Sequence, residues 1–201
     1  MEGSLVLEDG TIIRGPFFGS ERKVFGELVF NTNMTGYTEA LTDPSYRGQI
    51  LMMTYPLIGN YGVDLSSMES EEIQPTGFVV KEACAVPSHP KSAMDISRFL
   101  QQYHTPALQG ADTRMLTIRI RSRGTMKAAL VPHGEDLGDA AKTVRRMPHP
   151  DTRNLVAEGH DEGGDGGRSY LPQRLGGTLW DNRIILAQGR DAGGDGVFGR
   201  W

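Results

Sequence analysis

The sequence predicts a mixed α/β domain followed by an irregular glycine-rich tail, and three observations support that prediction. Short apolar runs bounded by turn residues, typical of buried strands, fill the first part of the chain. Segments with apolar residues at helical spacing follow them. After Glu158 the composition changes, because residues 159–201 hold 12 of the 26 glycines and no lysine. We therefore predict one domain over 1–158 and a tail over 159–201.

The N-terminal elements are predicted to be strands. In SLVLEDGTIIRG, apolar residues flank Asp9-Gly10, a pair that supplies the positive φ angles of a tight hairpin turn. Three further apolar runs read as buried strands: GELVFNT at 26–32, QILMMTY at 49–55 and TGFVVKEACAV at 76–86.

Helices and strands then alternate. The first predicted helix, in MDISRFLQQYH, has an apolar face made of Ile96, Phe99, Leu100 and Tyr103. DTRMLTIRIRSRG is predicted to be a helix from an N-cap at Asp112 to a stop at Gly124, with Leu116 and Ile120 on one face. PALQG and MKAALV are predicted strands. The last helix ends before Pro148 and has the apolar positions Leu137, Ala140, Ala141 and Val144.

Composition excludes several classes of partner and setting. The formal net charge of -4 over 201 residues gives no electrostatic reason to bind nucleic acid or an anionic membrane. A single cysteine, Cys84, cannot form a disulfide within the chain, which favours a reducing, cytoplasmic setting. The N-terminus does not read as a signal peptide, and the apolar runs are too short to span a bilayer.

Most motifs that could suggest chemistry have a structural explanation. The G-x-G-x-x-G from Gly194 to Gly199 lacks the following helix of a dinucleotide site, and the two GGDG units lack the aspartate of calcium-binding repeats. No histidine pair has zinc-ligand spacing. Cys84 has no nucleophile-elbow context, so we expect a buried structural thiol. We predict no catalytic residue and no metal site.

One polar, turn-rich stretch, residues 31–62, stands apart. Thr35 is predicted to cap a short helix, GYTEAL, before the turn TDPSY. Pro44 restricts φ, and Asp43 can accept hydrogen bonds from nearby backbone amides, so Ser45 would lie on a rigid turn. A hydroxyl placed in this way suits recognition of a polar ligand. From the pattern alone, a structural crossover whose polar groups satisfy one another is the favoured alternative.

Several phrases resemble one family closely. LVLEDGTIIRG, VFNTNMTGYTEALTDPSY followed by TYPLIGNYG, and GADTRMLTIRIRSRG are similar to the N-terminal domain of the small subunit of carbamoyl phosphate synthetase, over about residues 3–157. The resemblance implies a layered β/β/α domain. In that family a class I glutamine amidotransferase domain follows and hydrolyses glutamine. Its ammonia reaches a large subunit that makes carbamoyl phosphate for arginine and pyrimidine synthesis.

The resemblance also implies partners and one site residue. The N-terminal domain contributes to the interface with the large subunit, and the serine of the D-P-S-Y turn, here Ser45, reaches the glutamine site. ATP and Mg²⁺ would belong to the large subunit, because no ATP-binding signature is present here. The G-x-C-x-G-x-Q elbow of the glutaminase is absent, so we expect the chain alone to be inactive.

The match stops at NLVAEG, where the glycine-rich tail begins. We interpret the tail as a shifted reading frame or a truncated gene product, which translation of the DNA in the other two frames would test. Two alternatives to a synthetase subunit remain: a stand-alone interaction module and a non-functional remnant.

Overall fold

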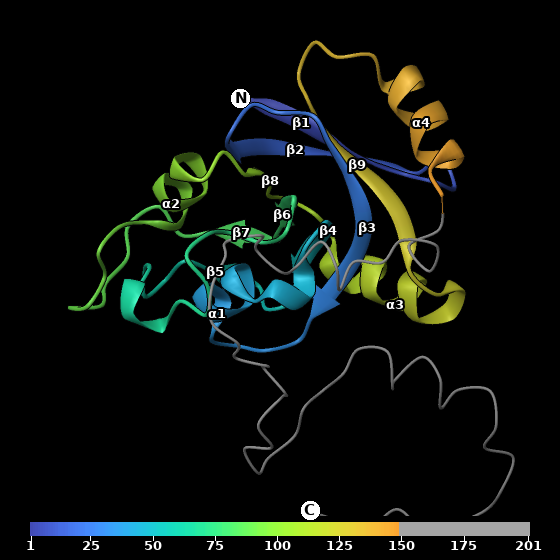
Figure 1. The fold of residues 1–201 in the computed structure, drawn as a ribbon. Coiled ribbons are helices and arrows are strands. Elements are labelled where there is room, and N and C mark those ends of the chain that lie inside the picture. Colours follow the sequence, from blue (N-terminus) through green and yellow to red (C-terminus); the bar gives the residue numbers. More distant parts are fainter. Residues whose placement is uncertain (149–201) are drawn as a thin grey trace, which may run out of the picture. The chain divides into compact units, whose positions relative to one another are not determined.

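The computed structural model describes residues 1–148, shown in colour in Figure 1. Within them, seven strands form a closed barrel, and two short strands form a separate sheet. The barrel strands are β1 (Glu2–Leu7), β2 (Ile12–Gly19), β3 (Val24–Asn31), β4 (Gln49–Met53), β6 (Gly77–Val79), β8 (Pro106–Leu108) and β9 (Met126–Pro132). The separate pair is β5 (Leu57–Ile58) and β7 (Glu82–Ala83). The helices are α1 (Tyr37–Thr42), α2 (Ile96–Gln102), α3 (Thr113–Arg123) and α4 (Leu137–Arg146), with two 3₁₀ turns, η1 (Pro44–Tyr46) and η2 (Leu65–Ser67).

The barrel combines two modes of strand pairing. Around it the order is β1-β2-β8-β6-β4-β3-β9, and β9 pairs with β1 to close it. β3, β4, β6 and β8 pair in parallel, whereas β1, β2 and β9 pair antiparallel with their neighbours. Parallel neighbours need crossover connections, which contain the helices and long loops. The mixed α/β class is thus confirmed, with strands dominating, and the layered β/β/α description remains a prediction.

Alternation along the strands divides the core into an interior and two outer faces. One cluster takes residues from all seven barrel strands, for example Leu5, Leu28 and Ile50, so it fills the barrel interior. The buried side chains of α3, Leu116 and Ile120, belong to the same cluster. The neighbouring strand positions belong to two outer clusters, one packed under α1 and α2 and one under α4. Each helix therefore covers a defined part of the barrel.

The hairpin and three helices form where the sequence predicts them. Gly10 has a φ of +88°, and β1 pairs antiparallel with β2 on either side of it. Asp95 and Asp112 cap α2 and α3 by accepting hydrogen bonds from backbone amides three residues on, each at 2.9 Å. α3 ends at Gly124, and α4 ends at Arg146, before Pro148.

The strand predicted over 76–86 is wrong as a single element. Its apolar half forms β6 in the barrel, but the chain then leaves the barrel, and Glu82–Ala83 forms β7 beside β5. The charged side chains of Lys81 and Glu82 are exposed at the break. A charged pair cannot continue a strand whose residues are buried on both faces, so the apolar run divides there.

Asp9 ties the β1–β2 hairpin to α3. Its carboxylate lies 3.1 Å from the guanidinium groups of both Arg119 and Arg123, and it accepts a hydrogen bond from the Thr11 amide at 2.9 Å. Desolvation alone would raise the pKa of this carboxyl, but the hydrogen bonds from Thr11 and the two arginines lower it below its ordinary value of 3.8.

The ion pairs of Asp9 with Arg119 and Arg123 predict a pH-dependent contribution to the free energy of unfolding. Because the pKa of Asp9 is lowered in the folded state, the stabilisation is complete above the pKa of the unfolded chain and is lost as pH falls through the folded value. Asp9→Asn is expected to lower the free energy of unfolding by about 1 kcal/mol at pH 7. Urea titrations should show the difference from wild type shrinking below about pH 4; a difference that is unchanged at pH 2.5 would contradict it.

The predicted boundary near 158 and the tail over 159–201 lie outside the described residues.

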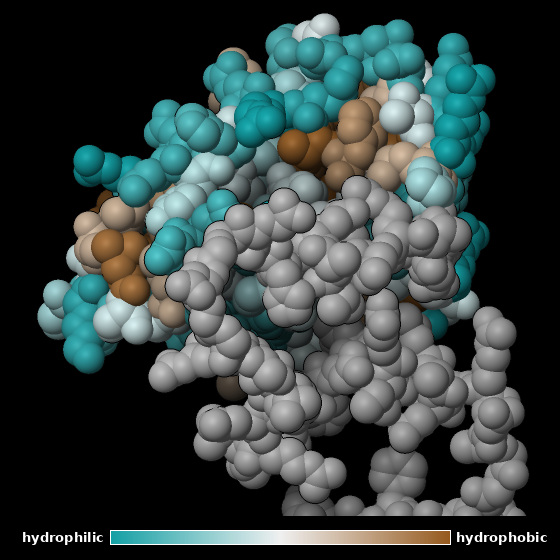
Figure 2. All heavy atoms as spheres, in the orientation of Figure 1, coloured by the Kyte–Doolittle hydropathy of each residue, from teal (hydrophilic) through white to brown (hydrophobic). Residues whose placement is uncertain are grey.

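The helices within residues 1–148 are too short and too polar to span a membrane. Where Figure 2 shows described residues, their surface is mostly hydrophilic, with smaller hydrophobic patches.

Candidate functional site

The crossover from β3 to β4 begins with a short helix that no local side chain caps. Gly36 takes the N-cap position of α1 with a φ of +81°, and the cap predicted at Thr35 is wrong. Instead, the Tyr61 hydroxyl accepts hydrogen bonds from the amides of Gly36 and Tyr37, at 2.7 and 3.3 Å. A side chain 25 residues away thus satisfies amides that a helix start leaves unpaired.

Two tyrosines tie α1 to the segment that follows β5. The rings of Tyr37 and Tyr61 stack with their centroids 4.3 Å apart, and the Tyr37 hydroxyl donates to the carbonyl oxygen of Gly62 at 2.5 Å. Tyr37 is 1% exposed. Burial raises the pKa of both phenols, so each keeps its proton at neutral pH. This pair anchors α1, and with it the turn that follows.

Removing the Tyr61 hydroxyl is expected to destabilise this anchor. Tyr61→Phe leaves two partly buried amides without their acceptor, which should lower the free energy of unfolding by about 2 kcal/mol in a urea titration. Tyr55 is a matched control, since it packs against the same cluster and its hydroxyl makes no hydrogen bond with the residues that the structure describes. Tyr55→Phe should change stability by less than about 0.5 kcal/mol. Equal losses in the two variants would refute the role of Tyr61.

Ser45 lies on the turn that the sequence predicts. The Asp43 carboxylate accepts a hydrogen bond from the Ser45 amide at 2.8 Å, Pro44 opens η1, and the Arg47 amide donates to the Pro44 carbonyl at 3.1 Å. Next to it, the buried Tyr46 anchors the turn in the core. The backbone around Ser45 is therefore held from both sides, as predicted.

A second turn of the same kind shows what distinguishes Ser45. At η2, Asp64 accepts a hydrogen bond from the Ser66 amide at 2.9 Å, but here the Ser66 hydroxyl also donates to the same carboxylate, at 2.6 Å. The exposed Ser45 hydroxyl makes no such hydrogen bond with the residues that the structure describes. Of these two hydroxyls, Ser45 is the one available to a ligand.

Acidic groups lie near this turn. Partial desolvation, followed by the negative charges of Asp43 and Glu39, raises the pKa of the Glu69 carboxyl. The Glu69 amide in turn donates to the Thr42 hydroxyl at 2.9 Å, at the end of α1. The negative charges of these carboxylates would attract a cationic group of a ligand bound beside the turn.

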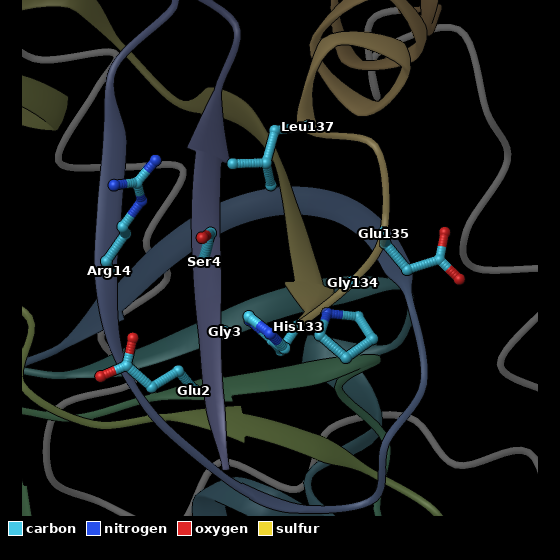
Figure 3. A pocket seen from close by; sticks show the side chains of 9 residues that line it. Glu2, Gly3, Ser4, Arg14, His133, Gly134, Glu135 and Leu137 are labelled. Carbon is cyan, nitrogen blue, oxygen red and sulfur yellow. The ribbon is translucent and has the colours of Figure 1, made fainter.

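A separate surface pocket of about 300 Å³ lies between β1, β2 and the loop from β9 to α4 (Figure 3). Its lining carries charges of both signs, Arg14 against Glu2 and Glu135, and includes the imidazole of His133. Glu135 is already paired with Lys23 at 2.7 Å. The mixed lining favours no ligand class, and His133 is exposed to solvent.

Neither cysteine nor metal chemistry is indicated by the described residues. Cys84 is half-buried, and its Sγ donates to the Val86 carbonyl at 3.3 Å, so the prediction of a buried thiol is wrong. It follows β7 directly, where the chain leaves the small sheet. No group of three or more His, Cys, Asp or Glu residues that could hold a metal ion occurs within 1–148.

Comparison with known proteins places the chain in a family. The family described as carbamoyl-phosphate synthase small chain, CPSase domain, matches residues 5–130. The carbamoyl phosphate synthase small chain of Methanosarcina acetivorans is 54% identical over 78% of this chain and 43% of its own length. That of Archaeoglobus fulgidus is 58% identical over 73% of this chain and 40% of its own, and that of Clostridium perfringens is 42% identical over 83% and 48%.

These matches cover most of the barrel and the whole crossover from β3 to β4. The chain spans less than half of the length of the curated relatives it matches. The chain belongs to the carbamoyl-phosphate synthase small chain family, through its CPSase domain.

Proposed function

We propose that this chain provides the part of a carbamoyl phosphate synthase small chain that docks on the large subunit. The observation that carries the proposal is the match of residues 5–130 to the CPSase domain, at 54–58% identity with two archaeal small chains. In such a complex, carbamoyl phosphate is made from glutamine, bicarbonate and ATP in the cytoplasm, for arginine and pyrimidine synthesis. ATP and Mg²⁺ are then bound by the large subunit.

Within this function, Ser45 contacts glutamine. The support is its free hydroxyl on a rigid turn, and the acidic groups nearby suit the ammonium of an amino acid. The nucleophile that attacks the glutamine amide belongs to a glutaminase domain of the complex. A thiol nucleophile needs a positioned base, and within residues 1–148 the hydrogen bond of the Cys84 thiol goes to the Val86 carbonyl and not to a base. The role of this chain in glutamine hydrolysis is therefore to bind and position substrate.

The test is co-expression of the chain with the large subunit of the same organism, followed by affinity purification on a tag carried by the chain. The proposal predicts that the large subunit is recovered in stoichiometric amount. Recovery of a different protein in its place would favour a stand-alone interaction module. Recovery of no partner, with the chain itself aggregating, would favour a non-functional remnant.

A further inference from the structure

The outward face of α3 carries an unusual set of side chains. Arg114, Ile118 and Arg121 lie at positions i, i+4 and i+7 and so share one face of the helix, opposite the buried Leu116 and Ile120. Ile118 is 60% exposed, the most exposed large apolar side chain on the α-helices within residues 1–148. An isoleucine between two arginines on an exposed helix is not needed to fill the barrel.

The other two arginines of α3 form ion pairs within residues 1–148, and Arg114 and Arg121 do not. Arg119 and Arg123 both pair with Asp9, as described above. The Arg114 side chain makes no ion pair or hydrogen bond with any residue from 1 to 148. Arg121 lies with its guanidinium carbon 6.0 Å from the centre of the Phe30 ring, a contact that leaves its hydrogen-bond donors open.

The helix dipole disfavours a positive charge at Arg114, which lies in the first turn, and favours one at Arg121, which lies in the last turn. α3 contains four arginines and no acidic residue. Because Arg114 is unpaired within residues 1–148 and lies at an unfavourable position, an ion pair with a carboxylate of another molecule would stabilise it more than most arginines.

We propose that the face formed by Arg114, Ile118 and Arg121 is a docking surface for the large subunit, whose complementary surface has carboxylates around an apolar centre. This inference rests on the proposed function. An apolar side chain at the centre with arginines around it is the composition typical of protein interfaces. The planar guanidinium also suits bidentate pairing with carboxylates. Nucleic acid is disfavoured, because the chain has a net charge of -4 and an exposed isoleucine gains nothing beside a phosphate backbone.

The experiment measures binding of the complete chain to the purified large subunit by isothermal titration calorimetry. Arg114→Glu with Arg121→Glu should raise the Kd at least about tenfold, and Ile118→Asp should do the same. The matched control reverses two exposed arginines elsewhere, Arg98→Glu on α2 with Arg146→Glu on α4, and should leave the Kd within twofold of wild type. Val86→Asp, at an 81% exposed position on a loop, controls for the loss of an exposed apolar group.

The outcomes separate this inference from the proposed function. If wild type binds and only the α3 variants are weakened, with unchanged thermal melting, the inference holds. If wild type binds and the α3 variants bind as tightly, the inference is wrong and the proposed function stands. If wild type does not bind, both are wrong. If a charge reversal disturbs folding, the double variant Arg114→Gln with Arg121→Gln replaces it. This variant should raise the Kd, and its Kd should depend less on salt concentration than that of wild type.

Discussion

Replacing Tyr37 with alanine is expected to lower the free energy of unfolding by about 4 kcal/mol. The side chain is almost completely buried, stacks on Tyr61 and donates to the carbonyl of Gly62. Its removal leaves a cavity in the cluster under α1 and breaks the contacts between α1 and the segment after β5. A urea titration followed by circular dichroism measures the loss, and the midpoint should fall with little change in slope.

The matched variant Tyr37→Phe separates the two contributions. It keeps the ring and its stacking but leaves the Gly62 carbonyl without its donor, so the expected loss is about 1 kcal/mol. If Tyr37→Ala cost no more than Tyr37→Phe, the ring would not anchor α1, and the positioning of the Ser45 turn would need another explanation.

Replacing Ser45 with alanine is expected to lower kcat/KM for glutamine hydrolysis by roughly 30-fold, mainly through KM, without loss of stability. The assay uses a chimera of residues 1–157 with the remaining length of the Archaeoglobus fulgidus small chain, which is 58% identical to this chain over 146 residues. The reason is that the free hydroxyl of Ser45 would lose a hydrogen bond to the substrate, while the turn itself is held by Asp43 and Pro44.

Ser66→Ala in the same chimera is the control, since Ser66 lies on a turn of the same kind but its hydroxyl is bound to Asp64. It should leave kcat/KM within twofold. An active chimera in which both alanine variants hydrolyse glutamine equally well would remove Ser45 from the site.

Much of the fold could be predicted because local physics determines its elements. The Asp-Gly turn, the caps at Asp95 and Asp112 and the stop at Gly124 act within a few residues, and the structure has all of them. The barrel could not be predicted in this way. Whether seven strands close on themselves depends on pairings such as β1 with β9, which join residues more than a hundred positions apart.

In the candidate site, too, the features set by neighbouring residues could be predicted, and those set by distant residues could not. The turn at Asp43 and Pro44 is local, and its predicted geometry is confirmed. Thr35 was a reasonable cap by residue type, but Tyr61 supplies the acceptor, and no rule of local spacing could have found it. That the Ser45 hydroxyl is free and the Ser66 hydroxyl is not also depends on side-chain geometry. The role of Ser45 in binding glutamine stays a prediction.

Sedimentation velocity of the purified chain mixed with its large subunit tests the central claim most directly. At about 1 µM of each protein, the account predicts a single faster-sedimenting species that contains one copy of each, as expected for a Kd of about 10 nM or tighter. Two independent boundaries at tenfold higher concentration would contradict it, because a domain that docks on the large subunit must form a complex there.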